Sequence, residues 1–283
     1  ESGSCSPNSI FYCENGAYRV GRHVVHDTHE YGWLSLQQII KYSSNIGAIK
    51  FSTKTGSEYL FRTLRNFGFG KKTGIDSPGE TAGSLASFKK WTKIDAGTIS
   101  FGQGISVSAL QLIAATSAIA NKGILMKPYV VQAITDQNGR LLKSFGPRQG
   151  KRVISEKTAK TLTRIMQTVT TEGGTGVNAA LSGHSVCGKT GTAQKIGKNG
   201  GYANGKYLSS FVGFVPSEHP KIAILVVIDE PKGQHYGGIV AAPGFRNIAQ
   251  KTLAYMNISP KSKTDGLIVS LGGKTKECNF RIY

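Results

Sequence analysis

Acidic residues are scarce in this 283-residue sequence: Asp and Glu number 16 and Lys and Arg number 35, so the formal net charge is +19. A surface this basic attracts polyanions such as nucleic acid, anionic lipid headgroups or an acidic envelope polymer, and charge alone does not choose among them. Only 18% of residues are charged and 39% are hydrophobic. That balance excludes a disordered or fibrous chain and suits one sizeable core or two small ones.

No apolar run is long enough for a membrane-spanning helix, which needs roughly 20 residues. The longest run, Ile222 to Ile228, predicts a buried strand. The 36 glycines have no triplet period, which excludes collagen and favours a fold with many tight turns. Because the sequence opens at Glu1 without an initiating Met or a targeting signal, we expect it to be a fragment of a longer protein.

Cysteine is rare as well, with four residues: Cys5, Cys13, Cys187 and Cys278. Only Cys5 and Cys13 are close enough in sequence to suggest a local disulfide, which would imply an oxidising compartment. Cys187 has apolar neighbours and is expected to be a buried thiol. The cysteines therefore leave both the Cys5–Cys13 bond and the redox compartment open.

Apolar residues recur at helical spacing in five segments. These segments are 34–53, 60–67, 106–123, 155–172 and 243–257. The first is interrupted by Ser43, Ser44 and Asn45, whose side chains compete for backbone hydrogen bonds. We therefore expect two helices that meet at an exposed corner. Ser35 is expected to cap the first of these two helices. Ser106 or Ser108 is expected to cap the helix over 106–123, and Ser155 the helix over 155–172.

Strand patterns dominate the last third of the chain and predict three adjacent antiparallel strands. Their segments are 186–196, 207–215 and 221–229. Segments 129–135 and 140–145 flank the turn sequence DQNG and predict a hairpin. A long loop with many Gly and Pro residues is expected over 68–91. Together these elements indicate an α+β fold, in which an antiparallel sheet is flanked by helices.

Residues Gly183 to Thr190 match the phosphate-loop pattern G-x-x-x-x-G-K-T. A phosphate loop follows a buried strand and opens a helix, whose N-terminal N–H groups hold the phosphates. Here NAALS precedes the motif and GTAQKIGKNGGY follows it, so neither flanking element is expected. We therefore reject nucleotide binding.

A metal site at His23, His26, His29 and Asp27 is a weaker alternative than a hydrogen-bonded loop. Nearby Gly and β-branched residues disfavour a helix, and in a strand residues three apart point in opposite directions. Binding to nucleic acid is also a minor alternative, because no helix-turn-helix, zinc-finger or RNA-binding motif accompanies the basic charge. We expect no metal, no cofactor and no nucleic-acid partner.

Two short motifs carry the strongest functional signal: Ser43-x-Asn45 at the predicted helix corner, and Lys189–Thr190–Gly191 in a predicted strand. They resemble two of the three signatures of penicillin-binding transpeptidases and serine β-lactamases. Longer stretches in the same order are similar to class B, division-associated penicillin-binding proteins. The stretches are HDTHEYGWLSLQQIIKYSSNIGAIK, FGFGKKTGIDSPGE, TISFGQGISVSALQLIAA, GILMKPYVV, EGGTG, CGKTGTAQK, SSFVGFVP and VVIDEPKG.

The resemblance implies that residues 1–258 form the C-terminal portion of a transpeptidase domain, lacking its N-terminal strands and nucleophile helix, and that residues 259–283 form a polar, Lys-rich tail. The family nucleophile lies in an S-x-x-K motif upstream of S-x-N. The only S-x-x-K here is Ser87 to Lys90, which lies downstream in a predicted loop, and we take it as a chance match. We therefore expect no nucleophile in this chain, and no activity from the chain alone.

For the intact protein, the resemblance implies a serine D,D-transpeptidase. Ser43 is expected to relay a proton, Asn45 to position Ser43 and the substrate amide, and Lys189 to supply positive charge. Thr190 or Thr192 would bind the substrate carboxylate, and the Thr192 N–H would be one oxyanion donor. Gly191 would let an extended peptide lie against the strand. However, period two places the side chains of Lys189 and Thr192 on opposite faces, unless the strand twists or bulges.

The implied substrate is a peptidoglycan stem peptide ending in D-Ala-D-Ala, and the implied inhibitors are β-lactams. The implied location is the extracytoplasmic face of the bacterial cytoplasmic membrane, beside membrane proteins of cell division or elongation. The alternative is a non-catalytic module of the same fold, which would bind peptidoglycan or a division partner through the same cleft.

Overall fold

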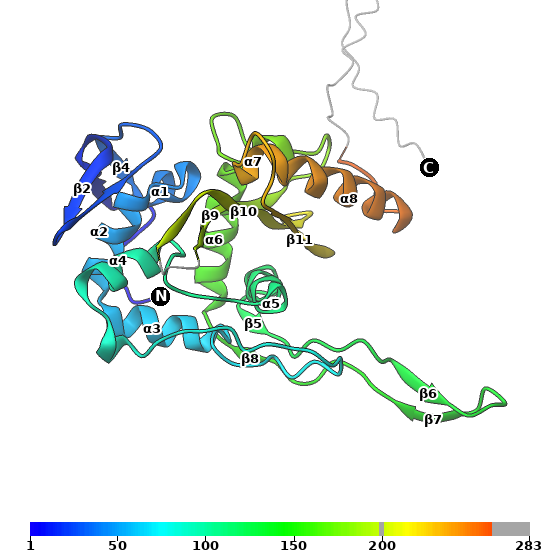
Figure 1. Cartoon of the computed structure of the whole chain (residues 1–283). Coiled ribbons are helices and arrows are strands. Elements are labelled where there is room, and N and C mark those ends of the chain that lie inside the picture. Colours follow the sequence, from blue (N-terminus) through cyan, green and yellow to red (C-terminus); the bar gives the residue numbers. More distant parts are fainter. Residues whose placement is uncertain (198–200, 262–283) are drawn as a thin grey trace, which may run out of the picture.

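A three-stranded antiparallel sheet lies at the centre of the computed structural model, which describes residues 1–197 and 201–261 (Figure 1). Its strands follow the order β11–β10–β9, so β9 is an edge strand within the described residues. The bounds are β9 Cys187–Ile196, β10 Tyr202–Val215 and β11 Ile222–Asp229. The register pairs Lys189 with Val212 and Gly191 with Ser210. The three strands predicted from the sequence are confirmed.

Helices cover both faces of this sheet, as expected for the predicted α+β class. Helices α7 (Gly237–Val240) and α8 (Ala242–Tyr255) pack on one face, and α5 (Ala109–Ala120) and α6 (Glu156–Thr168) pack on the other. On the α8 side, Phe211 and Phe245 are fully buried and contact each other edge to face. No helix among the described residues has the length and apolarity needed to cross a bilayer.

The remaining elements lie before the central sheet or extend from it. The helices are α1 (Leu36–Tyr42), α2 (Asn45–Thr55), α3 (Ser57–Asn66) and α4 (Lys93–Ser100), with 3-10 turns at Glu14–Gly16 (η1), Phe88–Lys90 (η2) and Val177–Ala179 (η3). The strands are β1 (Ile10–Tyr12), β2 (Ala17–Val20), β3 (His23–His26), β4 (Trp33–Ser35), β5 (Ile124–Leu125), β6 (Ala133–Thr135), β7 (Leu141–Ser144) and β8 (Lys151–Arg152). They pair antiparallel as β1–β4, β2–β3, β5–β8 and β6–β7.

The predicted helices begin where side chains can cap them. Ser35 and Ser108 form capping boxes at the starts of α1 and α5, and Ser155 accepts a hydrogen bond from the Thr158 N–H at the start of α6. These hydroxyls satisfy N–H groups that the helix itself leaves free. The capped helix starts are therefore confirmed.

Helix α4 was not predicted. It is eight residues long and begins at a capping box formed by Thr92 and Asp95, but its interior includes Gly97, a weak helix former. Packing against α2 stabilises it instead: a Cβ on Gly97 would lie 3.5 Å from the Ile49 side chain. The long loop expected before α4 is present and includes only the short turn η2.

Strands β6 and β7 form the predicted hairpin, which projects from the body of the molecule (Figure 1). We call residues 129–146 the arm. Cys5, Cys13 and Cys187 are free thiols, and Cys13 and Cys187 are buried, so the prediction for Cys187 is confirmed. Of the predicted tail, residues 262–283 lie outside the described residues, as does Cys278.

Candidate active site

The corner between α1 and α2 presents Ser43 to solvent. Ser43 ends α1 in the left-handed conformation, with φ 58°, and is exposed. The next residue, Ser44, is buried and caps α2 by accepting a hydrogen bond from the Gly47 N–H at 2.9 Å. A non-glycine residue adopts a positive φ only at an energetic cost, so the surrounding contacts must hold this conformation. The predicted break at Ser43–Asn45 is confirmed.

The carboxylate of Asp27 stabilises this corner by binding the residues that directly follow Ser43. Its Oδ1 accepts hydrogen bonds from the N–H groups of Asn45 at 2.6 Å and Ile46 at 3.1 Å, and its Oδ2 accepts the Ser44 hydroxyl at 2.6 Å. The adjacent His26 carbonyl accepts the Asn45 side-chain amide at 3.0 Å. A negative charge at a helix N-terminus is favourable, so Asp27 fixes the start of α2.

Lys189 extends from edge strand β9 to this corner. Its Nζ donates to Ser43 Oγ at 2.6 Å and to the Thr190 carbonyl at 3.0 Å. Ser43 and Lys189 lie 146 residues apart in sequence, and the structure brings them together as the two motifs predict. Burial lowers the pKa of the Lys189 ammonium from 10.5 to about 8, because removal from water disfavours the charged form. At neutral pH Lys189 is therefore mainly protonated, and a modest rise in pH would remove its proton.

The threonine side chains of the motif lie on the other face of β9. The Thr190 hydroxyl is 3.0 Å from the Thr175 hydroxyl, and Thr192 Oγ1 accepts the Gly237 N–H at 3.1 Å. No bulge interrupts the register between Lys189 and Thr192. The side chains of Lys189 and Thr192 therefore do not meet, as strand alternation predicts.

Gly191 lies between these residues on the Lys189 face of β9. A Cβ at this position would lie 2.5 Å from Ser210 Oγ on the neighbouring strand. The first contact of a larger residue is thus with the sheet itself. Because Gly191 has no side chain, nothing projects from the strand beside Lys189, and an extended chain can approach the edge of β9.

Sequence reasoning missed two residues that support the site. The sequence indicates Asp27 only as a metal ligand, and no local pattern marks a carboxylate that caps a helix 18 residues later. Thr175 lies in the motif EGGTG, which by itself indicates no role for this residue. Its N–H and hydroxyl each lie 3.4 Å from the Lys41 carbonyl on α1, and its hydroxyl contacts Thr190 on β9, so it links the two halves of the site.

The other sequence candidates do not join this site. Ser87 precedes the 3-10 turn η2, which packs near α3, and Lys90 is exposed. Thr190 continues into strand β9, so no helix follows the phosphate-loop pattern. Across residues 1–197 and 201–261, no three His, Cys, Asp or Glu side chains are placed to hold a metal ion. Asp27 binds the α2 backbone instead.

Known proteins resemble this chain over most of its length. Residues 1–250 match the family model described as the penicillin-binding protein transpeptidase domain. The probable peptidoglycan D,D-transpeptidase PenA of Neisseria meningitidis is 38% identical over 245 residues, covering 86% of this chain and 40% of PenA. Peptidoglycan D,D-transpeptidase FtsI of Escherichia coli is 37% identical over 250 residues, covering 88% of this chain and 40% of FtsI. The chain thus spans about two fifths of the length of these relatives.

Solved structures with a similar fold also cover most of this chain. The transpeptidase domain of penicillin-binding protein 3 from Burkholderia pseudomallei superimposes with a TM-score of 0.82 at 35% identity, covering 91% of this chain and 75% of that one. Penicillin-binding protein 3 from Mycobacterium tuberculosis, in complex with aztreonam, gives 0.84 at 31% identity, covering 92% of this chain and 60% of that one.

Proposed function

The chain belongs to the penicillin-binding protein transpeptidase family, and from this premise we propose that it supplies the S-x-N and K-T-G half of a peptidoglycan D,D-transpeptidase site. In the proposed reaction, a serine hydroxyl attacks the penultimate D-Ala carbonyl of a stem peptide. The bond to the terminal D-Ala breaks, and a neighbouring stem amine then takes the acyl group. The single observation that carries the proposal is the contact between Ser43 Oγ and Lys189 Nζ at 2.6 Å.

The direction of this hydrogen bond defines a role for Ser43. The Lys189 ammonium donates to Ser43 Oγ, so the Ser43 proton remains free for another acceptor. We assign that proton to the leaving D-Ala nitrogen, which must gain one when the peptide bond breaks. The Asn45 amide nitrogen is held by the His26 carbonyl, which leaves the Asn45 carbonyl oxygen to accept a substrate N–H.

Edge strand β9 would hold the substrate backbone. Its outer N–H and C=O groups can pair with an extended peptide, and the Thr192 N–H would be one oxyanion donor. Lys189 would attract the terminal carboxylate, and the hydroxyl of Thr190 or Thr192, on the other face of β9, would reach that carboxylate around the edge of the strand. We propose that the acylated serine lies outside these 283 residues, because the only S-x-x-K begins at Ser87.

The proposed site of action is the extracytoplasmic face of the cytoplasmic membrane, where peptidoglycan is cross-linked. The net charge of +19 suits an anionic envelope. Membrane proteins of division or elongation are the proposed partners. Support comes from relatives whose names include a peptidoglycan transpeptidase and a stage V sporulation protein.

Labelling with a fluorescent penicillin tests the function. A form of the protein that includes the S-x-x-K serine is expected to become covalently labelled, whereas the 283-residue chain is expected to remain unlabelled. Ser43→Ala should lower the labelling rate about 100-fold or more, and Ser182→Ala, at an exposed serine outside the site, should leave it unchanged. If no form is labelled, the non-catalytic binding module replaces the transpeptidase.

A further inference from the structure

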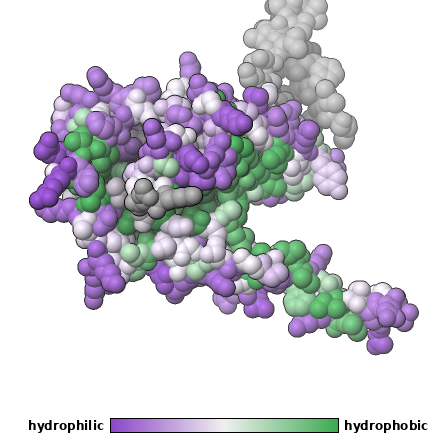
Figure 2. All heavy atoms as spheres, in the orientation of Figure 1, coloured by the Kyte–Doolittle hydropathy of each residue, from purple (hydrophilic) through white to green (hydrophobic). Residues whose placement is uncertain are grey.

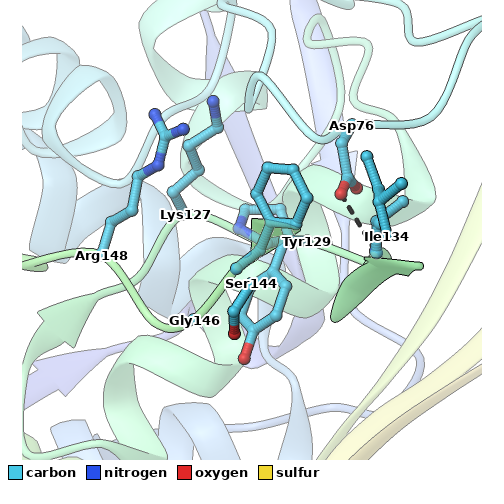
Figure 3. A pocket seen from close by; sticks show the side chains of 10 residues that line it. Asp76, Lys127, Tyr129, Ile134, Ser144, Gly146 and Arg148 are labelled. Atoms are coloured by element: carbon cyan, nitrogen blue, oxygen red, sulfur yellow. Dashed lines mark hydrogen bonds between the residues drawn. The ribbon is translucent and has the colours of Figure 1, made fainter. Parts of the chain in front are cut away.

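Two neighbouring cavities lie at the root of the arm, and no residue of the Ser43–Lys189 site lines either of them. Their volumes are about 440 Å³ and about 270 Å³, and both are lined by Lys127 and Pro128. The larger cavity opens between the arm and the loop that carries Asp76 (Figure 3). Because the two cavities share a wall, they form one continuous surface, which we call the arm root.

The arm root is strongly basic. Its cations are Lys71, Lys72, Lys127, Arg148 and Lys151, all of which are exposed. Within the part of the chain that the structure describes, none of these five side chains forms an ion pair with a carboxylate. Figure 3 shows Lys127 and Arg148 extending side by side at the larger cavity. Like charges so close together repel each other, so an anionic ligand would be attracted.

The nearby carboxylates do not neutralise this charge by direct contact. Asp76 is the acid that lines the cavities, and its oxygens accept the N–H groups of Val130 at 2.8 Å and Val131 at 3.0 Å. These hydrogen bonds hold the pKa of the Asp76 carboxyl below its usual value. Glu80, just outside the cavities, is similarly held by N–H groups of the 73–74 loop. Both carboxylates therefore stabilise loop backbone through hydrogen bonds and do not form ion pairs with the lysines.

The arm root also has apolar walls. The larger cavity is lined by Tyr129, Val131, Ile134 and Phe145, and the smaller one by Phe67, Leu125 and Met126. Along the arm, Val130 and Leu142 are 70% and 63% exposed, and Figure 2 shows this apolar surface continuing outward from the body. Exposed apolar groups of this kind often mark an interaction site.

The backbone of the arm is available for pairing as well. Strands β6 and β7 form a sheet of only two strands within the described residues, and every residue of both strands is exposed. An isolated two-stranded hairpin is only marginally stable in water, and its outer edges carry free N–H and C=O groups. An extended segment could add to either edge.

We propose that the arm root and the arm bind an acidic, extended segment of a partner protein, in which carboxylate and apolar side chains alternate. Carboxylates would meet Lys127, Arg148 and the neighbouring lysines, and the apolar side chains would cover the cavity walls. A bare phosphate polymer has no apolar groups to bury there. A second copy of this chain would bring the same positive charge to the contact and be repelled.

A designed peptide tests this proposal without reference to transpeptidase activity. The probe is a fluorescein-labelled 12-residue peptide of alternating Glu and Val, and its binding to the protein is measured by anisotropy. It should bind at least about tenfold more tightly than a Glu–Ser peptide of equal charge. In a competition measurement, long-chain polyphosphate of equal charge should bind more weakly than the Glu–Val peptide. Higher salt should weaken its binding, because the charged contacts are exposed.

Paired variants locate the site. Lys127→Glu with Arg148→Glu should weaken binding at least about tenfold. Lys221→Glu with Lys251→Glu makes the same charge change at exposed residues near β11 and on α8, and should have little effect. Ile134→Thr should weaken the Glu–Val peptide but not the Glu–Ser peptide. Equal loss in both charge variants, or equal affinity for both peptides or for polyphosphate, would overturn the proposal.

Discussion

Lys189 Nζ lies 2.6 Å from Ser43 Oγ, although Lys189 is on edge strand β9 and Ser43 is on the corner between α1 and α2. The two residues belong to separate motifs that have no contact in sequence. Their hydrogen bond couples a hydroxyl, which can release a proton without becoming charged, to an ammonium group with a lowered pKa. The chemistry of the site therefore depends on how firmly the corner and the strand are held against each other.

In a form of the protein that includes the S-x-x-K serine, to which all acylation rates below refer, the rate of β-lactam acylation should fall as pH rises through about 8. The pKa of Lys189 in the free protein is about 8, and deprotonation removes both the positive charge and the hydrogen-bond donation to Ser43. The pH profile of the second-order acylation constant reports this free-protein pKa. Lys189→Arg cannot titrate in this range, so its profile, at a lower rate, should be flat from pH 7 to 9. A wild-type profile that rises through pH 8 would instead make Lys189 a base.

Stability should rise with pH between about 8 and 10.5. In this window the unfolded chain, with a lysine pKa near 10.5, binds more protons than the folded chain, in which burial lowers the pKa of Lys189. Folding is therefore favoured as protons are removed, and the gain across the whole window is at most about 3 kcal/mol. Urea unfolding at pH 7.5 and pH 10 measures it. Lys189→Met should abolish this contribution, and an unchanged pH slope in that variant would contradict the assignment.

Asp27→Asn should weaken both the fold and the site. The substitution removes the negative charge at the start of α2 and one of the acceptors for Ser44 and the Asn45 and Ile46 N–H groups. We expect a loss of about 1–2 kcal/mol in the free energy of unfolding, and acylation about tenfold slower. Asp76→Asn is a matched control, because Asp76 also binds two consecutive N–H groups but lies outside the site.

A double-mutant cycle separates these two effects of Asp27. If Asp27 acts by positioning Ser43, then Asp27→Asn should slow acylation much less in a Ser43→Ala background. An equal slowing in both backgrounds would mean that Asp27 only stabilises the fold.

Gly191→Ala should slow acylation, and a second substitution on the neighbouring strand β10 can distinguish strain in the sheet from obstruction of the substrate. The new Cβ would lie 2.5 Å from Ser210 Oγ, so the sheet must shift or the serine must rotate. Adding Ser210→Ala removes that clash, because the Ser210 Cβ would lie 3.8 Å from the new methyl group, and should restore thermal stability. Acylation should remain slow in the double variant if the Cβ also obstructs the substrate backbone. Full recovery of the rate would show that strain within the sheet was the whole effect.

Local sequence signals were sufficient where the structure depends on neighbouring residues. Ser35 and Ser108 mark helix starts because capping hydrogen bonds reach only three residues along the chain. The strand pattern of 186–196 holds because alternation is a property of the extended backbone. Helix α4 was missed because its sequence is a weak helix former and its stability comes from packing on α2.

The sequence by itself determined the family motifs, the helix corner at Ser43–Asn45 and the opposite faces of Lys189 and Thr192. Only the tertiary structure decided that Asp27 caps α2, that Thr175 links α1 to β9, and that Lys189 is buried enough to have a pKa of about 8. The physical reason is range. Backbone geometry and capping act over a few residues, whereas desolvation and contacts between distant segments exist only after the whole chain has packed.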